Sequence, residues 1–300
     1  MDRSRDEVPP LNAEDCPGGP TIDLHLHSTA SDGECPPEKV VERAARAGLV
    51  AIALTDHDTL DGIPAALTAG ARLGVRVVGG CEFSVAAAWG EMHVLGYFLP
   101  PESPSLAEFL VGCRADRERR GRLMVERLQK MGVTIDLEDL LLESGGGAIG
   151  RPHLARALVR RGAVGDMDDA FARYIGRGKP GFVEKALPTF RQVAELVHAA
   201  GGVVSAAHLK DRGTRSVLQK LKHEGLDAVE TRHPGHDPDL RARLTDLALA
   251  LGLLRTGGSD WHGDAGAAET HADLGSQAVP ADWLERLEAV RPVFRTHAGT

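Results

Sequence analysis

Short apolar runs alternate with amphipathic stretches along most of the chain, beginning at Thr21. Apolar runs of strand length occupy 21–28, 49–58, 75–85 and 91–99. Between them, 37–48 and 62–74 space their apolar positions as a helix does, and Gly48 and Gly74 stand where each helix should end. Strands that alternate with helices of this length are typical of βαβ units, so the pattern predicts a parallel sheet.

The pattern changes after residue 99 and returns near residue 186. In between, the spacing of apolar and charged positions predicts one long charged helix and three shorter ones, at 104–131, 136–143, 152–162 and 166–174. Afterwards the helix patterns 189–202, 214–225 and 237–252 alternate with the strand patterns 203–208, 226–233 and 253–262, and a last helix is predicted at 281–289. We therefore expect a disordered leader at 1–19, an α/β barrel domain formed by 20–99 and 186–300, and a helical insertion at 100–185.

Composition narrows the possible functions. The 43 acidic side chains outnumber the 35 basic ones and give a formal net charge of −8, which argues against stable binding of duplex nucleic acid through bulk charge. The four cysteines, Cys16, Cys35, Cys81 and Cys113, form no C-x-x-C pair and are typical of a reduced, cytoplasmic protein. The N-terminus lacks the apolar segment of a signal peptide, and no apolar run reaches about eighteen residues, so we expect neither secretion nor a membrane span.

Histidines and acidic residues gather at the predicted strand ends. The candidate metal ligands, in chain order, are His25, His27, Asp32, His57, Glu82, His93, His208, Asp260 and His262. The carboxyl ends of parallel strands in a barrel share one mouth, so these side chains should converge there. The H-x-H spacing of His25 and His27 turns both rings to the same side of a strand, where one ion can take both. A lone histidine in a strand is usually a core residue, but this whole set predicts a metal site.

The type of ligand narrows the choice of metal. Imidazole and carboxylate suit zinc, iron or manganese, and no thiolate selects a softer ion. Glu82 can bridge two ions because a carboxylate has two oxygens. By contrast, GGGAIG at 145–150 satisfies G-x-G-x-x-G but follows an acidic helical pattern instead of a strand. We interpret it as a loop that leads into the next helix and could act as a lid, not as a dinucleotide site.

The ordered motifs DLHLHSTASDG, LTDHDT, EMHVLGY, SAAHL and GGSDWHG, together with Glu82, resemble the PHP (polymerase and histidinol phosphatase) family of the amidohydrolase superfamily. The segments GRPHLARALVRRG and GKPGFV resemble the insertion of its stand-alone branch, which includes 3',5'-nucleoside bisphosphate phosphatases and 5'-3' exoribonucleases. The resemblance implies a distorted (β/α)7 barrel with a helical insertion. It departs from the family pattern at Leu209, where proline is usual, and at ETRHPGH, 230–236.

The resemblance also implies how the ligands divide among ions. One ion would be held by His25, His27, Glu82 and Asp260, a second by Glu82, His93 and His208, and a third by Asp32, His57 and His262. We therefore expect two to three divalent ions, Mn, Fe or Zn. The expected catalytic residues are Glu82, Asp260 and His262, around a metal-bridging hydroxide that attacks the phosphate.

A phosphorylated substrate needs further cationic or polar contacts. Arg151 and His153 stand at the start of a predicted helix, a place that favours anions, and Lys179 lies in GRGKPG. His233 is the fourth predicted substrate contact. Trp89 or Trp261 could stack on a base near the mouth, although packing is the commoner use of tryptophan.

Together these observations predict a metal-dependent phosphohydrolase acting on a phosphate monoester of a small nucleotide-like substrate, such as a 3',5'-nucleoside bisphosphate. The alternatives are a phosphodiesterase or 5'-3' exonuclease acting on short oligonucleotides, a histidinol phosphate phosphatase, and a non-catalytic module associated with a polymerase. The acidic chain favours small substrates, and the complete ligand set favours catalysis. The metal motifs do not separate monoester from diester hydrolysis, nor do they identify the physiological metal, the general acid or the oligomeric state.

Overall fold

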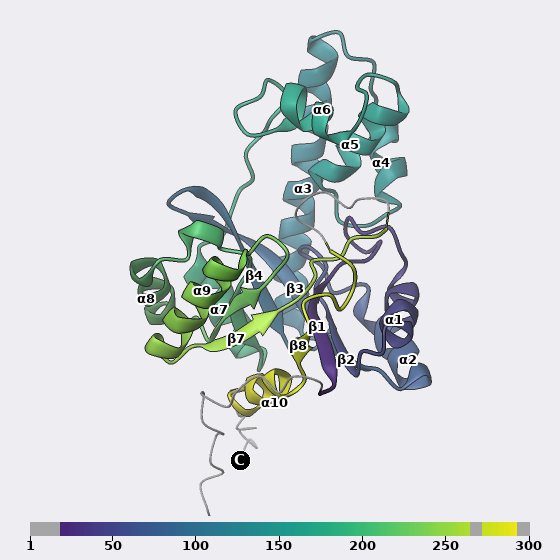
Figure 1. Cartoon of the computed structure of the whole chain (residues 1–300). Helices are drawn as coiled ribbons and strands as arrows, with labels where there is room; N and C mark the ends of the chain where they lie inside the picture. Colours follow the sequence, from purple (N-terminus) through teal and green to yellow (C-terminus); the bar gives the residue numbers. More distant parts are fainter. Residues whose placement is uncertain (1–18, 265–271, 293–300) are drawn as a thin grey trace, which may run out of the picture.

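The computed structural model describes residues 19–264 and 272–292, which form an α/β body with a helical projection (Figure 1). In this described part of the chain, eight strands form a single sheet in the order β7-β6-β5-β4-β3-β2-β1-β8. The strands are β1 (Thr21–Leu26), β2 (Ala51–Leu54), β3 (Arg76–Ala87), β4 (Gly90–Tyr97), β5 (Val203–Ala206), β6 (Ala228–Arg232), β7 (Leu254–Gly257) and β8 (Val279–Pro280).

The sheet bends into a nearly closed barrel. The segment after β7 returns to β1, where Leu26 and Trp261 form a parallel bridge and the His27 N–H donates to the Trp261 carbonyl at 3.0 Å. The predicted distorted barrel is therefore confirmed. Its strands are not all parallel, however, because β4 runs antiparallel to both β3 and β5. A two-residue turn at 88–89 joins β3 directly to β4, and so short a connection permits only an antiparallel pair.

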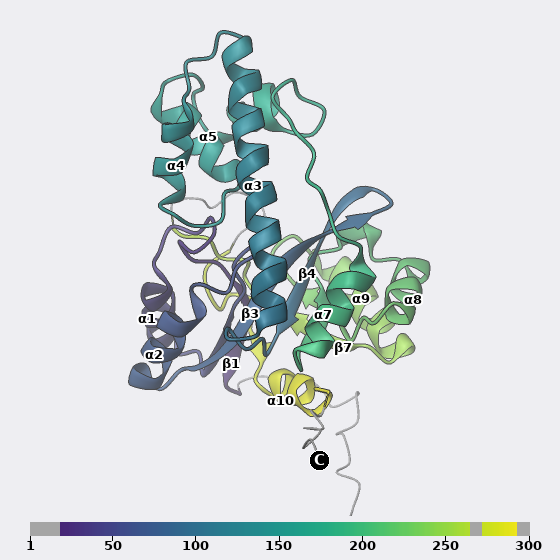
Figure 2. The ribbon, with the colours of Figure 1, turned by 180° about the vertical axis from the view of Figure 1, so that it is seen from behind.

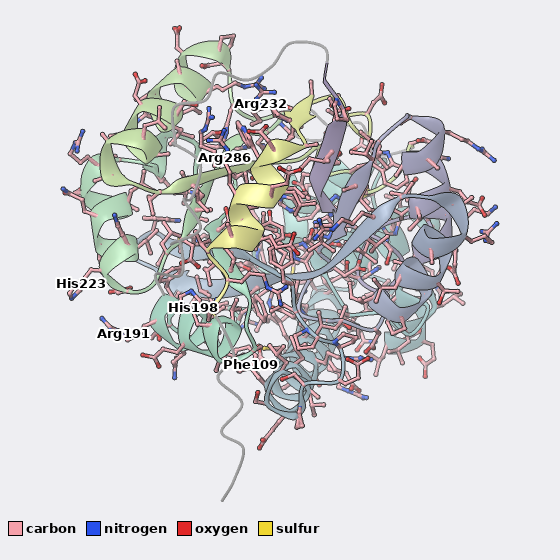
Figure 3. All side chains as sticks on the ribbon, turned by 90° about the horizontal axis from the view of Figure 1, so that it is seen from below. Phe109, Arg191, His198, His223, Arg232 and Arg286 are labelled. Atoms are coloured by element: carbon pink, nitrogen blue, oxygen red, sulfur yellow. The ribbon has the colours of Figure 1, made fainter. Side chains whose placement is uncertain are left out.

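Helices cover the outside of the barrel and close one of its ends. The outer helices are α1 (Pro37–Arg46), α2 (Ile63–Leu73), α7 (Phe190–Ala199), α8 (Arg215–His223) and α9 (Pro238–Leu251). Side chains alternate along each strand, so Ile52 packs in the core beneath these helices while Ala53 faces the barrel interior. The last helix, α10 (Asp282–Ala289), lies across the lower end of the barrel and packs Trp283 and Leu287 into that interior (Figure 3).

The helical projection rises above the opposite end of the barrel. It contains α3 (Pro104–Lys130), α4 (Leu137–Ser144), α5 (Arg151–Arg160), α6 (Met167–Ala170) and the π-helix η1 (Phe171–Ile175). The long helix α3 confirms the prediction for 104–131 and runs from the barrel into the projection (Figure 2). Leu106 and Leu110 pack in the outer core of the barrel, whereas Met124 and Leu128 pack in a separate core of the projection.

The helix predicted at 166–174 differs from the structure. It is divided into α6 and the π-helix η1, whose last bond runs from the Gly176 N–H to the Phe171 carbonyl, five residues earlier, at 2.9 Å. The limits predicted for the insertion, 100 and 185, stay predictions, because α3 contributes to both cores. Of the predicted leader, residues 1–18 lie outside the described part of the chain.

The glycine segment 145–150 packs against the loop after β1. The Ala148 N–H donates to the Ala30 carbonyl at 2.9 Å. A Cβ atom on Gly147 would lie 2.5 Å from the Thr29 carbonyl oxygen, so only glycine permits this approach. The segment therefore fixes the projection to the loop that carries Asp32.

Two predictions from composition can be compared with the structure. Within the described residues, none of the helices is both long and apolar enough to cross a membrane. Cys35, Cys81 and Cys113 are free thiols, and Cys16 lies outside the described residues.

Candidate metal centre

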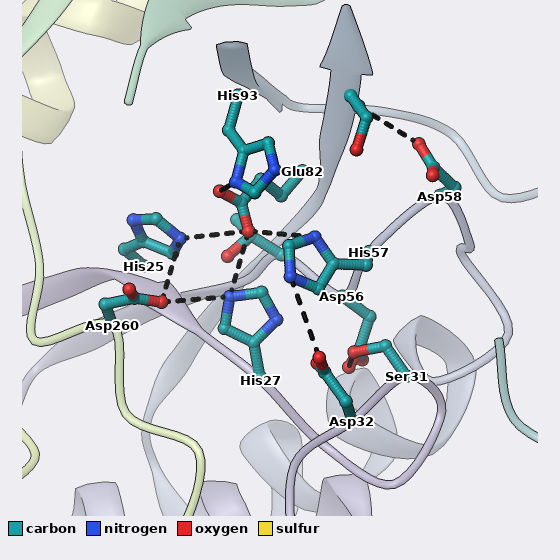
Figure 4. Close-up of polar contacts among 12 residues, drawn as sticks. His25, His27, Ser31, Asp32, Asp56, His57, Asp58, Glu82, His93 and Asp260 are labelled. Carbon is teal, nitrogen blue, oxygen red and sulfur yellow. Dashed lines mark hydrogen bonds and ion pairs between the residues drawn. The ribbon is translucent and has the colours of Figure 1, made fainter. Parts of the chain in front are cut away.

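All nine predicted ligands lie at the end of the barrel beneath the helical projection. Figure 4 shows His25, His27, Asp32, His57, Glu82, His93 and Asp260 converging there. Eight of them stand in or after parallel strands, as predicted. His93 reaches the same place from β4, because the first half of an antiparallel strand lies beside the last half of its neighbour. In β3, Cys81 and Phe83 pack in the outer core, so Glu82 between them points into the barrel.

Four side chains form the first ligand group: His25, His27, Glu82 and Asp260. The Nε2 atom of His25 lies 3.4 Å from Glu82 Oε2 and 3.3 Å from Asp260 Oδ1. The Nε2 atom of His27 lies 3.2 Å from each of the same two oxygens. Ligand atoms bound at about 2.0–2.1 Å to a tetrahedral ion lie about 3.3–3.4 Å apart, so this group fits one ion as it stands.

The second group differs from the set implied by the family resemblance. Glu82, His93 and His57 lie close enough to share an ion, with His93 Nδ1 2.8 Å from Glu82 Oε1 and His57 Nδ1 3.1 Å from Glu82 Oε2. His208, expected in this set, is outside the geometric group, although its Nε2 lies 3.0 Å from Glu82 Oε1. Glu82 therefore contacts side chains of two groups, as a bridging carboxylate does.

The third group contains Asp32, His57 and His262, as expected, together with His27. His262 Nε2 lies 3.4 Å from Asp32 Oδ1, and His57 Nε2 lies 3.9 Å from Asp32 Oδ2. A neutral imidazole offers one lone pair to a metal, and the Nε2 of His27 already faces the first group. We therefore place His27 with the first group.

Buried atoms without hydrogen-bond partners test whether these residues suit cations. Among the described residues, such atoms include His25 Nε2, both nitrogens of His27, His57 Nδ1 and Asp32 Oδ1. A buried polar atom left without a partner typically costs about 1–3 kcal/mol, so clusters of them are rare in stable folds. The other such atoms, on Arg117, Thr231, Arg241 and Ser259, are outside the ligand groups. Because five of these unpartnered atoms are concentrated in the ligand groups, the residues present fit divalent ions.

The pKa values within the cluster diverge. Burial lowers the pKa of His57 to about 3 despite Glu82 and Asp32 nearby, so its ring is neutral and able to bind a metal. Burial alone would also lower the pKa of His27, but the adjacent carboxylates of Asp260 and Glu82 raise it to about 10. An ion bound there would take the place of that proton.

A buried carboxylate, Asp56, supports the loop that carries Asp32. Its Oδ1 accepts bonds from the Ser28 N–H at 2.7 Å and from the Ser31 hydroxyl at 2.6 Å, and its Oδ2 accepts the Ser28 hydroxyl at 2.7 Å. The neighbouring His57 is a candidate ligand, so one short segment both supplies a candidate ligand and holds another in place. The supporting role of Asp56 was not predicted, because the TDHD motif shows that an acidic residue is present but not which groups donate hydrogen bonds to it.

Asp23 has a similar role beside Asp260. Its Oδ1 accepts the N–H groups of His25 and Ser259 at 3.2 and 3.0 Å, and it is almost fully buried. A Cβ on Gly258 would lie 2.4 Å from the backbone nitrogen of His25, which explains the glycine in GGSDWH. The chain turns immediately afterwards, and Asp260 has a φ of 51°, in the left-handed region.

Two adjoining cavities lead from the ligands to the projection. The inner cavity, of about 220 Å³, is lined by the ligands His93 and His208. The outer cavity, of about 210 Å³, lies between the barrel and the projection and is lined by Arg120, Arg177 and Lys185. Both are lined by Trp89, Glu91, Arg151 and Arg212.

The four predicted substrate contacts have different surroundings. Arg151 lines both cavities, but Lys179 is exposed and lines neither of them. His153 is buried and accepts the Gly150 N–H at 2.9 Å, which caps the start of α5. His233 is also buried, with its Nε2 3.4 Å from Asp260 Oδ2 and its Nδ1 accepting the Gly235 N–H. The structure therefore gives both histidines supporting contacts where substrate contacts were predicted.

The tryptophans also differ from one another. Trp89 lies at the tip of the β3–β4 hairpin with the Arg212 guanidinium 5.6 Å from its ring centre. Trp261 is buried in the outer core of the barrel, so it cannot stack on a base there.

A curved sheet with histidines and carboxylates converging at one end defines a barrel metalloenzyme. The chain belongs to the PHP domain family, whose model matches residues 23–252. It is 35% identical over 247 residues to the 5'-3' exoribonuclease Rnm of Salmonella typhimurium, covering 80% of this chain and 84% of that one. It is 34% identical over 263 residues to the 3',5'-nucleoside bisphosphate phosphatase of Chromobacterium violaceum, covering 84% and 91%.

Two further comparisons extend this result. A 246-residue match to the error-prone DNA polymerase of Mycobacterium tuberculosis is 52% identical, but it covers 79% of this chain and only 18% of the polymerase. The crystal structure of a metal-dependent phosphoesterase from Bifidobacterium adolescentis superposes with a TM-score of 0.83 at 33% identity, covering 91% of this chain and 96% of that one. The chain is therefore a metal-dependent phosphoesterase of the PHP family.

Proposed function

We propose that the enzyme hydrolyses a phosphate monoester of a small nucleotide-like substrate that carries a second phosphate, such as a 3',5'-nucleoside bisphosphate. The observation that carries this proposal is the cationic outer cavity next to the ligand cluster. In the described residues, no carboxylate lies within ion-pair distance of Arg151, which is half-buried, or of Arg120, which is buried and donates from Nε to the Val183 carbonyl at 2.6 Å. A buried guanidinium without a counter-ion costs free energy unless an anion binds there.

The geometry of the two arginines supports an anion site. Arg120 and Arg151 each approach the ring of Phe182, at 5.6 and 5.7 Å from its centre. Burial and the neighbouring charge of Arg151 lower the pKa of Arg120 to about 10, which still leaves it charged at neutral pH. Lys185 adds a third cation, although it is already paired with Glu91. A phosphate in this cavity would be held away from the ligands, in the place of a non-reacting group.

The nine ligands would hold the ions, with the first group formed by His25, His27, Glu82 and Asp260. When bound, divalent ions lower the pKa of water towards neutrality and neutralise charge on a phosphoryl group. The residues of the chain then position the substrate. Arg151 lines both cavities, so it can bind the reacting and non-reacting parts of one molecule. Such positioning contributes to rate by fixing the reacting groups before the reaction.

The second candidate is exonuclease activity on short oligonucleotides. Trp89 and the exposed Arg212 favour it, since an aromatic ring and a guanidinium at a cavity edge can bind a neighbouring nucleotide. The exoribonuclease relative favours it as well. A non-catalytic role is less well supported, because this chain retains all nine ligands in one cluster.

Phosphate release tests the choice. We expect kcat/KM for a 3',5'-nucleoside bisphosphate to exceed that for the matching 3'-monophosphate by about 10–100-fold, the worth of one charge-assisted contact of about 1.5–3 kcal/mol. A 5'-phosphorylated dinucleotide and histidinol phosphate serve as alternative substrates. Faster turnover of the dinucleotide would replace the proposal with the exonuclease, and equal rates on bisphosphate and monophosphate would remove the role of the outer cavity.

A further inference from the structure

Glu230 is a completely buried carboxylate with a partner for each oxygen. It lies in β6, where Ala228 faces the barrel interior and Val229 the outer core, so the alternation turns Glu230 into the barrel. Its Oε1 lies 3.0 Å from His25 Nδ1, and its Oε2 accepts the backbone N–H of His208 at 2.7 Å. One side chain therefore contacts two of the expected ligands.

The contact with His25 determines which ring nitrogen is free. An ionised carboxylate only accepts hydrogen bonds, so the proton of the His25 ring must lie on Nδ1. Its Nε2 is then left with a lone pair that points at Glu82 and Asp260, at 3.4 and 3.3 Å. A carboxylate behind a ligating histidine fixes the ring in this way in many metal sites.

The contact with His208 acts on the backbone. His208 has a φ of 27°, which residues other than glycine rarely adopt. Such a backbone conformation costs about 1–3 kcal/mol and persists only where the surrounding structure holds it. The Glu230 carboxylate holds the N–H of that residue. The resulting turn directs the His208 ring at Glu82, with Nε2 3.0 Å from Oε1.

We propose that Glu230 is a positioning residue for metal binding: it sets the tautomer of His25 and the turned backbone of His208, and so prepares ligands on both sides of Glu82. This rests on the proposed assignment of His25 and His208 as ligands. Glu230 itself stays outside the three ligand groups found among the described residues.

The substitution Glu230→Gln should move the proton of the His25 ring from Nδ1 to Nε2. The backbone N–H of His208 can only donate, so it would take the single amide oxygen of Glu230→Gln. The amide NH2 would then face His25 Nδ1 and require it to accept, which moves the ring proton to Nε2, the nitrogen that should bind the ion. The substitution keeps the shape of the side chain and changes only which atoms can accept.

The chain offers a matched control at the other end of the barrel. The Oδ2 of Asp227 lies 2.7 Å from His198 Nε2 and accepts the Val204 N–H at 2.8 Å, the same combination of imidazole and backbone amide. His198 lies near the end of α7, just before β5 begins, and Figure 3 shows it in the view from below. Asp227→Asn should therefore disturb stability without altering metal binding.

Zinc titration of the metal-stripped proteins tests the proposal. We expect Glu230→Gln to weaken zinc binding at one or more sites by about 10–100-fold, the usual effect of removing such a partner, and Asp227→Asn to leave it within about threefold of the wild type. Wild-type zinc affinity in folded Glu230→Gln would overturn the proposal, as would an equal loss in Asp227→Asn.

A second measurement does not depend on whether the variant folds. Nitrogen-15 NMR of the zinc-loaded wild-type protein should show His25 protonated at Nδ1 and bound to zinc through Nε2. The opposite assignment would overturn the proposal. Both measurements report metal binding and not turnover, so an enzyme that fails to release phosphate from a bisphosphate would refute the proposed substrate and leave the role of Glu230 to be decided separately.

Discussion

At the scale of single residues, Glu82 lies at the centre of the site. Within 3.4 Å, its two carboxylate oxygens contact the imidazoles of His25, His27, His57, His93 and His208. Burial alone would raise the pKa of this carboxyl group, but the surrounding histidines hold it well below its usual range. These contacts favour the anionic form of Glu82, which is the state that a bridging ligand needs.

Arg151 and Lys179 provide the first prediction, because only Arg151 lines the cavities. Arg151→Ala should raise KM for a bisphosphate and lower kcat/KM by about 10–100-fold, since one charge-assisted contact is worth about 1.5–3 kcal/mol. Lys179→Ala, at an exposed position, should leave both values within about twofold. Steady-state phosphate release measures both variants, and a larger effect from Lys179→Ala would contradict the placement of the substrate.

Residues differ in how far their roles can be predicted from the sequence. His25 and His27 stand two apart at a strand end, so the pattern alone gives their common direction. The role of Glu230 depends on His25, which is 205 residues away, and that of Arg120 depends on the absence, among the described residues, of a carboxylate at ion-pair distance. Neither condition is visible in a local pattern. Substrate contact by His153 and His233 stays a prediction, because a motif shows which residues are present but not which atoms they face.

At the scale of elements, α3 joins the barrel to the helical projection through a buried ion pair. Arg117 donates from Nε to Asp58 Oδ2 at 2.7 Å and from Nη1 to the Ile149 carbonyl at 3.1 Å. Asp58 follows the ligand His57, so the same contact ties the projection to the metal site. The alternation of strands and helices predicted both segments, but the antiparallel β4 and this cross-link depend on connections and contacts that periodicity does not reveal.

Breaking this pair provides the second prediction. Both side chains are about 95% buried, so Arg117→Met would leave the Asp58 carboxylate buried with only the Ser84 N–H, at 3.3 Å, and without its cationic partner. We expect a loss of about 3–5 kcal/mol in the free energy of unfolding, read as a lower midpoint in urea. The control is Arg122→Met on the same helix, whose exposed pair with Glu118 should contribute at most about 0.5 kcal/mol. Similar midpoints for the two variants would show that the Arg117 pair does not hold the projection in place.

At the scale of the whole molecule, charge is distributed unevenly. The chain carries a net charge of −8, yet the outer cavity is lined by several arginines and Lys185. The ligand cluster beside it concentrates carboxylates and imidazoles from β1 to the segment after β7. The fold class could be predicted because one rhythm of strands and helices spans the chain, whereas the cavity could not, since residues of the barrel and the projection form it together. Ions in the cluster would connect the first and last strands of a barrel that is closed by few backbone bonds.

Removing the metal should therefore weaken the whole barrel as well as the reaction. We expect chelation to abolish phosphate release and to lower the melting temperature by about 5–10 °C. An ion present at a hundred times its dissociation constant adds about 2.7 kcal/mol to the free energy of unfolding. For a chain of this size, about 1 kcal/mol shifts the melting temperature by about 2–4 °C. Adding Mn²⁺ or Zn²⁺ should restore both. Differential scanning calorimetry with parallel metal analysis makes the measurement, and His57→Gln provides the control because it removes a candidate ligand without a chelator. Full activity or an unchanged melting temperature in protein shown to contain no metal would contradict the assignment of this cluster as a structural and catalytic metal centre.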